Sequence, residues 1–116
     1  SQMNKSGAQA EQMAAQYLQG QGLKLLQMNY TCRFGEIDLI MLDGETHVFV
    51  EVRLRSNTAF GGAAASIDTR KQTKLVRTAQ HYLSRMQRLP PCRFDAILMQ
   101  SSDSRHIAWI RNAFSA

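Results

Sequence analysis

Long apolar segments are absent from this chain of 116 residues. The longest uncharged apolar stretches, at residues 39–42 and 47–50, are far shorter than the ~20 residues that span a bilayer. The first ten residues are polar and carry no hydrophobic core of a signal peptide. We therefore expect a cytoplasmic protein with no membrane partner.

Cysteine is scarce, and its two copies stand alone. Cys32 and Cys92 form neither a CxxC pair nor a Cys/His cluster at zinc spacing, so a structural zinc or a dense disulfide framework has no support. Reduced thiols are the simpler interpretation, with a single disulfide left open. The glycine pairs lack the lysine of a phosphate loop, and no histidine stands at a nucleophile–base spacing.

Acidic residues are outnumbered, with nine Asp and Glu against 14 Lys and Arg. The net charge of +5 and a pI near 9.7 favour anionic partners, nucleic acid first and a membrane surface second. A hydrophobic fraction of 44% and this length are typical of one globular domain. We expect residues 7–116 to form it, after a disordered or expression-derived N-terminus at residues 1–6.

Hydrophobic periodicity predicts seven elements in the order αβββαββ. They are a helix over residues 7–18 capped by Ser6, strands over 23–30, 36–42 and 46–53, a helix from Asp68 or Thr69 to 88, and strands over 93–99 and 106–112. The nearly uncharged, glycine-containing segment 56–66 reads as a mobile connection and a candidate lid. This order predicts an α/β domain in which helices flank a mixed sheet.

Charged residues gather on one face of the hairpin predicted from the second and third strands. Residues two apart in a strand share a face, so Glu36 and Asp38 lie together, as do Glu51 and Arg53. Either two-residue turn puts all four on one face, and one register sets Asp38 opposite Glu51. Two unit charges near 5 Å repel by roughly 3–4 kcal/mol at an effective dielectric of 20. This repulsion is offset by Arg53 with Arg55, by a raised pKa that leaves one carboxyl neutral, or by a divalent cation.

The plainer alternative is a half-solvated sheet face with cross-strand salt bridges. Ile40 shares the face of Asp38 and Phe49 that of Glu51, which indicates that a helix covers this face. Charged pairs in such places tend to be functional. Glu11, in the middle of the apolar stripe of the first helix, either reaches the same cluster or extends into water.

Five short motifs carry a resemblance to a known family. They are GEIDLIM at 35–41, VFVEVRLR at 48–55, FG at 60–61, RFD at 93–95 and IRNAF at 110–114. Over residues 7–114 the chain resembles the YraN-type family of small bacterial proteins, whose biological role is unassigned. That family is similar in fold to restriction endonucleases and archaeal Holliday-junction resolvases of the PD-(D/E)xK superfamily. The resemblance implies a restriction-endonuclease-like three-layer fold with an acidic site for Mg²⁺ or Mn²⁺.

The resemblance also implies roles for individual residues. Asp38 matches the motif aspartate, and Glu51 matches the (D/E) position. Glu11 matches the acidic residue on the first helix, and Glu36 would be an outer ligand or a ligand of a second metal. Position 53 departs from the usual Glu-Val-Lys pattern, because it holds Arg53. Arginine can stabilise a phosphate, but its strongly basic guanidinium cannot act as a general base.

Basic residues around the second helix are candidates for phosphate contacts. They are Arg55, Arg70, Lys71 and Lys74. Some relatives in the superfamily are thought to place their lysine on such a helix, so Lys71 is a candidate for that role as well. The alternative is that Lys71 and Lys74 are solvated surface charges.

These observations predict a divalent-metal-dependent endonuclease that acts on structured or branched DNA. The alternative is a weak or inactive nucleic-acid-binding or adaptor module that keeps the fold, which the arginine at position 53 favours. A protein-interaction scaffold indifferent to nucleic acid is a third option. Resolvases act as dimers because a junction presents two symmetric strands, so the resemblance raises a homodimer as a partner state.

Overall fold

A mixed five-stranded sheet forms the centre of the computed structural model, which describes residues 5–54, 67–100 and 106–116. The elements are α1 (Lys5–Gly20), β1 (Lys24–Cys32), β2 (Gly35–Asp43), β3 (Thr46–Leu54), α2 (Thr69–Leu83), β4 (Cys92–Met99) and β5 (Ile107–Phe114). Neighbouring strands in the sheet follow the order β1-β2-β3-β4-β5. Strands β3 and β4 are parallel, and the other pairs are antiparallel. The predicted order αβββαββ and the three-layer restriction-endonuclease-like fold are confirmed.

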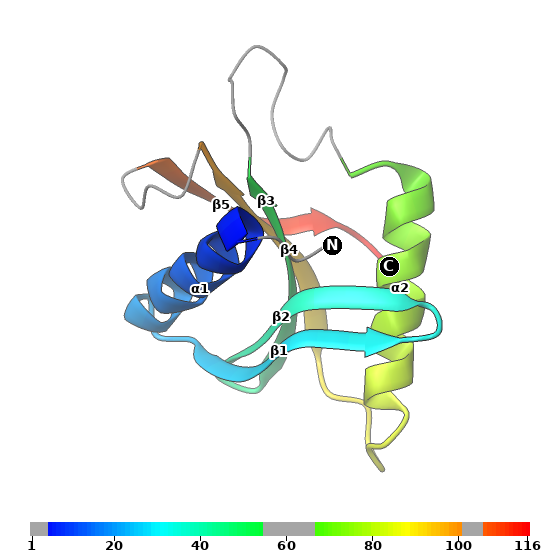
Figure 1. The fold of residues 1–116 in the computed structure, drawn as a ribbon. Helices are drawn as coiled ribbons and strands as arrows, with labels where there is room; N and C mark the ends of the chain where they lie inside the picture. Colours follow the sequence, from blue (N-terminus) through cyan, green and yellow to red (C-terminus); the bar gives the residue numbers. More distant parts are fainter. Residues whose placement is uncertain (1–4, 55–66, 101–105) are drawn as a thin grey trace.

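The two helices cover opposite faces of the sheet (Figure 1). The cluster under α1 joins the small side chains of that helix to alternate residues of β3 and includes Ala10, Ala14, Leu18, Val48 and Val50. The cluster under α2 joins Leu75, Ala79, Tyr82, Phe49 and Phe94. Because side chains alternate along a strand, β3 is buried on both faces. No helix in the described part of the chain is long and apolar enough to cross a membrane.

Both helices differ from their predicted bounds. α1 begins at Lys5, so its first turn lies inside the segment expected to precede the domain, and Ser6 lies within the helix rather than at its cap. A helix can extend in this direction because its first N–H groups need no acceptor inside the helix. α2 begins after the predicted cap Asp68 but ends at Leu83, five residues early. The Ser84 hydroxyl donates a hydrogen bond to the backbone carbonyl of His81 at 2.7 Å, which closes the last turn of the helix.

The β2–β3 hairpin has one of the two predicted registers. Asp43 pairs with Thr46 across a two-residue turn, in which Gly44 has a φ of 62°. That conformation favours glycine, as the turn composition predicted. The ladder then runs to the pair formed by Leu39 and Val50. The next two residues, Asp38 and Glu51, therefore face each other at the end of the ladder.

Strands β1 and β2 bend sharply at Asn29. This residue has a φ of 54°, and it stands between Met28, which packs on the α1 cluster, and Tyr30, which belongs to the α2 cluster. Strict alternation would put Met28 and Tyr30 on the same face. The bend carries the turn end of the hairpin over to α2 (Figure 1). The end of β2 before Asp38 follows it, since Ile37 also joins the α2 cluster.

Two predictions fall outside the described residues. They are the candidate lid at 56–66 and the phosphate contact of Arg55.

Candidate active site

Asp38 stands where β2 and β3 separate. The last residue pair of the ladder between these strands is Leu39 with Val50. Just beyond it, Oδ2 of the Asp38 carboxylate accepts the backbone N–H of Val52 at 2.8 Å. The side chain therefore takes the place of a β2 backbone acceptor for this N–H group of β3, and only 1% of Asp38 is exposed. Its carboxylate is held at a fixed place beside Glu51.

Glu51 brings two cations to this position. It is 4% exposed, and its Oε2 lies 3.1 Å from Nε of Arg53 and 3.4 Å from Nζ of Lys71. Arg53 comes from the same strand two residues on, whereas Lys71 comes from the first turn of α2. The predicted convergence of Asp38, Glu51 and Arg53 is thus found, and Lys71 joins them from the helix that covers this face.

The electrostatics of the pair oppose ionisation of Glu51. Burial raises the pKa of the Glu51 carboxyl most, and the negative charge of Asp38 raises it further. Lys71 and Arg53 lower this pKa, and a side-chain hydrogen bond with Asp38 raises it. The net direction is upward, so two cations only partly offset burial and the second carboxylate. Of the three offsets considered for the pair, the neighbouring cations and a raised pKa operate together.

The other two predicted ligands, Glu11 and Glu36, come from α1 and from the start of β2. Glu11 is 3% exposed on α1, which covers the sheet face opposite to α2 and Lys71. Glu36 is half-buried and pairs with Thr31 at the turn end of the β1–β2 hairpin. Within the described ranges, no three His, Cys, Asp or Glu side chains are grouped to hold a metal. Metal binding by Glu11 and Glu36 stays a prediction.

The carboxyl pair by itself offers a donor set that suits Mg²⁺. This ion prefers oxygen ligands and is commonly held by one or two carboxylates, with water and substrate phosphates completing the octahedron. Asp38 and Glu51 provide two carboxylates from adjacent strands. The residues present therefore fit one Mg²⁺ or Mn²⁺ bound jointly with a phosphate.

The remaining predicted phosphate contacts lie along α2. Arg70 and Lys74 are exposed, and Lys71 is half-buried against Glu51. The helix begins at a cap where Asp68 accepts the backbone N–H of Lys71 at 2.8 Å. Its first turn is thereby fixed, which aims the Lys71 side chain at the sheet.

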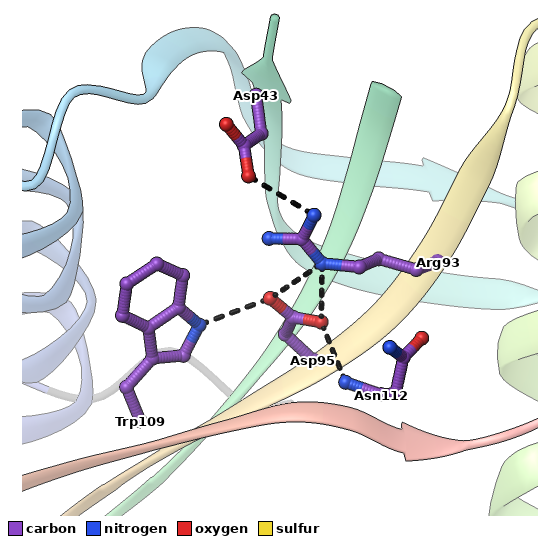
Figure 2. Close-up of polar contacts among 5 residues, drawn as sticks. All are labelled: Asp43, Arg93, Asp95, Trp109 and Asn112. Carbon is purple, nitrogen blue, oxygen red and sulfur yellow. Dashed lines mark hydrogen bonds and ion pairs between the residues drawn. The ribbon is translucent and has the colours of Figure 1, made fainter.

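A second buried carboxylate, Asp95 on β4, was not among the predicted site residues. Figure 2 shows its partners: Nε of Arg93 at 3.1 and 3.2 Å, Nε1 of Trp109 at 2.9 Å and the backbone N–H of Asn112 at 3.0 Å. Arg93 also contacts Asp43 at 3.0 Å. Every partner of Asp95 is a donor from this chain, which is typical of a structural carboxylate. The only sequence signal was the RFD motif, which gives no role.

Comparison with known proteins gives the family. A sequence model of the uncharacterised protein family UPF0102 matches residues 10–99. The chain belongs to the UPF0102 family. A UPF0102 protein of Nitrosomonas eutropha is 60% identical to it over 98% of this chain and 97% of its own length. One from Nitrosomonas europaea is 57% identical over the same shares, and one from Stutzerimonas stutzeri is 49% identical over 100% and 99%.

The UPF0102 match confirms the resemblance that the motifs carried. It spans β2, β3 and α2, the three elements that supply the carboxyl pair and its cations. The relatives' names state no activity, so chemistry has to be argued from the side chains.

Proposed function

We propose that this UPF0102 protein is a divalent-metal-dependent endonuclease that hydrolyses phosphodiester bonds in structured or branched DNA. One observation carries the proposal: Asp38 and Glu51 are buried side by side where β2 and β3 separate, with Arg53 and Lys71 at the same glutamate oxygen. A buried carboxyl pair that raises the pKa of one member is more typical of a functional site than of a structural one.

Asp38 and Glu51 are the residues that would hold the metal. When bound, Mg²⁺ or Mn²⁺ lowers the pKa of a water ligand and neutralises charge on the phosphate. The carboxylates supply negative charge that the chain offsets only in part, which favours uptake of a cation. The hydrogen bond from Val52 fixes the orientation of Asp38, so the pair needs little rearrangement on binding.

Arg53 and Lys71 together take the roles that one lysine has in the usual Glu-Val-Lys pattern. A guanidinium binds and orients phosphate oxygens through its planar N–H groups, which is the role that Arg53 would take. Lys71 brings a primary amine to within 3.4 Å of the same Glu51 oxygen, from where it can donate to an incoming phosphate. The geometry thus supports Lys71 as the lysine of this site.

The test combines metal binding with cleavage. Calorimetry with Mn²⁺ is run on the wild type, on Asp38→Asn and on Glu45→Gln, which removes an exposed acid from the β2–β3 turn. We expect Asp38→Asn to weaken Mn²⁺ binding by about tenfold to a hundredfold and to abolish cleavage of a synthetic four-way junction. Glu45→Gln should behave as wild type. A wild type that takes up no Mn²⁺, with or without junction, would contradict the proposal.

Two further variants assign the cations. Lys71→Gln should lower the rate of cleavage with Mn²⁺ binding retained, whereas Arg53→Lys should preserve or raise it. Equal loss in both variants would argue against a special role for Lys71.

The second candidate is an inactive nucleic-acid-binding module. It is favoured by the two cations already paired with Glu51, and by the lack of a third acidic or histidine ligand beside the pair among the described residues. DNA binding that weakens with salt, without cleavage in Mg²⁺ or Mn²⁺, would support this candidate over the enzyme.

A further inference from the structure

The positive charge of the chain is concentrated in one stretch. Residues 69–94 contain no Asp or Glu. They contain half of the Lys and Arg residues of the chain, namely Arg70, Lys71, Lys74, Arg77, Arg85, Arg88 and Arg93. This stretch is α2 with its continuation into β4, and all of these cations except Arg93, which pairs with Asp43 and Asp95, lie on or just after α2.

Four cationic or imidazole side chains line up along α2, and a fifth follows in the turn after it. We call them the basic stripe: Arg70, Lys74, Arg77, His81 and Arg85, all of them exposed. Successive members are three or four residues apart, which puts the four on α2 on one side of that helix. At 1.5 Å per residue, the part of the stripe from Arg70 to His81 is about 16 Å long.

The turn between β1 and β2 widens the basic stripe. The Arg33 guanidinium lies 4.7 Å from the centre of the Phe34 ring, and that ring lies 6.1 Å from the ring of His81. Arg85 lies over Tyr82 at 4.7 Å and over Tyr30 at 5.6 Å. Stacking fixes the plane of a guanidinium while its edge N–H groups still reach an acceptor. The aromatic rings therefore orient arginines toward solvent.

The basic stripe begins beside the carboxyl pair. Lys71, next to its first member, contacts Glu51 at 3.4 Å. A chain of phosphates that enters the site at Lys71 can therefore continue along α2. The backbone N–H of Lys71 is taken by Asp68, so side chains, and not the helix N-terminus, provide the attraction.

We propose that the basic stripe, with Arg33, is the track that binds the sugar–phosphate backbone of a nucleic acid on its way to Asp38 and Glu51. This inference rests on the proposed function, since it names where the substrate lies outside the site. The helical part of the stripe matches the length of about five base pairs at 3.4 Å per pair along each strand. A membrane surface fits less well, because the large apolar side chains exposed in the described residues, Leu26, Leu54 and Leu89, lie off the stripe.

The test measures binding without chemistry. A fluorescein-labelled 20-base-pair duplex and the matching single strand are titrated with the full chain in EDTA, and anisotropy is followed at several salt concentrations. The stripe variant is Lys74→Gln with Arg77→Gln, and the matched control is Lys24→Gln with Arg111→Gln, two exposed cations elsewhere on the sheet. Thermal melting verifies that both are folded.

We expect the stripe variant to bind the duplex about tenfold more weakly or worse, and to lower the slope of log affinity against log salt by about 2, because each lost phosphate contact removes about 0.9. The control should change affinity by less than about twofold. Equal losses in both variants, no loss in the stripe variant, or binding of the wild type only to phosphatidylserine vesicles would each overturn the track.

The two proposals fail in different ways. If the wild type binds the duplex through the stripe but cleaves nothing in Mn²⁺, the endonuclease proposal fails and the track remains. If the wild type cleaves and the stripe variant binds and cleaves like the control, the track fails and the endonuclease proposal remains.

Discussion

Two buried aspartates lie on either side of the central strand β3, and their surroundings differ. Asp38 on β2 and Asp95 on β4 are each 1% exposed, and each stands at a bend near an asparagine of positive φ, Asn29 with 54° and Asn112 with 50°. Asp95 receives N–H groups from Arg93, Trp109 and Asn112. Asp38 receives the N–H of Val52 and has a second carboxyl beside it.

The difference indicates a structural role for Asp95 and supports the role proposed for Asp38. At the β4–β5 bend, the chain supplies the donors that a buried charge requires. At the β1–β2 bend, the chain adds Glu51, and the cations that it supplies leave the pKa of Glu51 raised. Proteins accept such local conflicts mostly at functional sites. The two bends can be compared by experiment, because each aspartate has a conservative replacement.

The largest effect is expected from Asp95→Ala. The substitution leaves the Arg93 guanidinium and the Trp109 N–H without their buried acceptor, and losing one partner of a buried ion pair costs about 3–5 kcal/mol. Urea unfolding followed by the fluorescence of Trp109 measures the loss. Asp43→Ala, which removes the 39%-exposed partner of the same arginine, should cost less than about 1 kcal/mol. Similar costs for both would make Asp95 no more structural than a surface acid.

Asp38→Asn should leave the free energy of unfolding within about 1 kcal/mol of wild type. The amide oxygen still accepts the N–H of Val52, and the repulsion with Glu51 disappears. Asp38→Ala, which also removes the acceptor, should cost about 1–3 kcal/mol. The same urea titration distinguishes these variants. A loss in Asp38→Asn as large as that in Asp95→Ala would mean that the two bends do not differ in kind.

Glu51→Gln should alter how stability depends on pH. The folded pKa of Glu51 is raised above its ordinary value of 4.5, so the folded state retains a proton that the unfolded state has lost. Wild-type stability therefore falls as pH rises from about 4.5 through the higher folded pKa. Glu51→Gln lacks this decline, so it should be the more stable protein at about pH 8, with the difference shrinking below about pH 4.5. Glu45→Gln, in the exposed turn, should run parallel to wild type.

The two asparagines at the bends offer a further comparison. Asn29→Ala and Asn112→Ala should each cost about 1 kcal/mol, because alanine tolerates a positive φ less well than asparagine does. Glycine at either position should cost less than alanine. Glycine at position 29 also removes the buried Oδ1 of Asn29, which accepts no hydrogen bond from the described residues. Thermal melting compares the four variants, and equal melting of the alanine and glycine forms would contradict a conformational role.

Local patterns in the sequence predicted most of the fold. The alternation in β2 and β3 and the turn at Gly44 gave the register that sets Asp38 beside Glu51, and Asp68 caps α2 as predicted. These features depend on residues close in sequence or paired across a short turn. A few neighbouring side chains are therefore enough to determine the register and the cap.

Contacts between distant segments were harder to predict. The approach of Lys71 to Glu51 depends on where α2 crosses the sheet, and no spacing in the sequence encodes that position. Alternation also failed at Asn29, where a positive φ moves Tyr30 to the other face. Asparagine is enriched in this conformation, so its presence in a strand was the one available hint. The partners of Asp95 come from a register shift between β4 and β5, which periodicity does not reveal.

The parallel pairing of β3 with β4 has a consequence for folding kinetics. Parallel strands require a long crossover, and here α2 lies within it, between Leu54 and Cys92. Closing so large a loop is slow compared with forming the β2–β3 hairpin. The hairpin can therefore bring the two carboxyls together early, whereas Lys71 arrives only after α2 docks. We therefore expect the two carboxyls to meet before Lys71 reaches them.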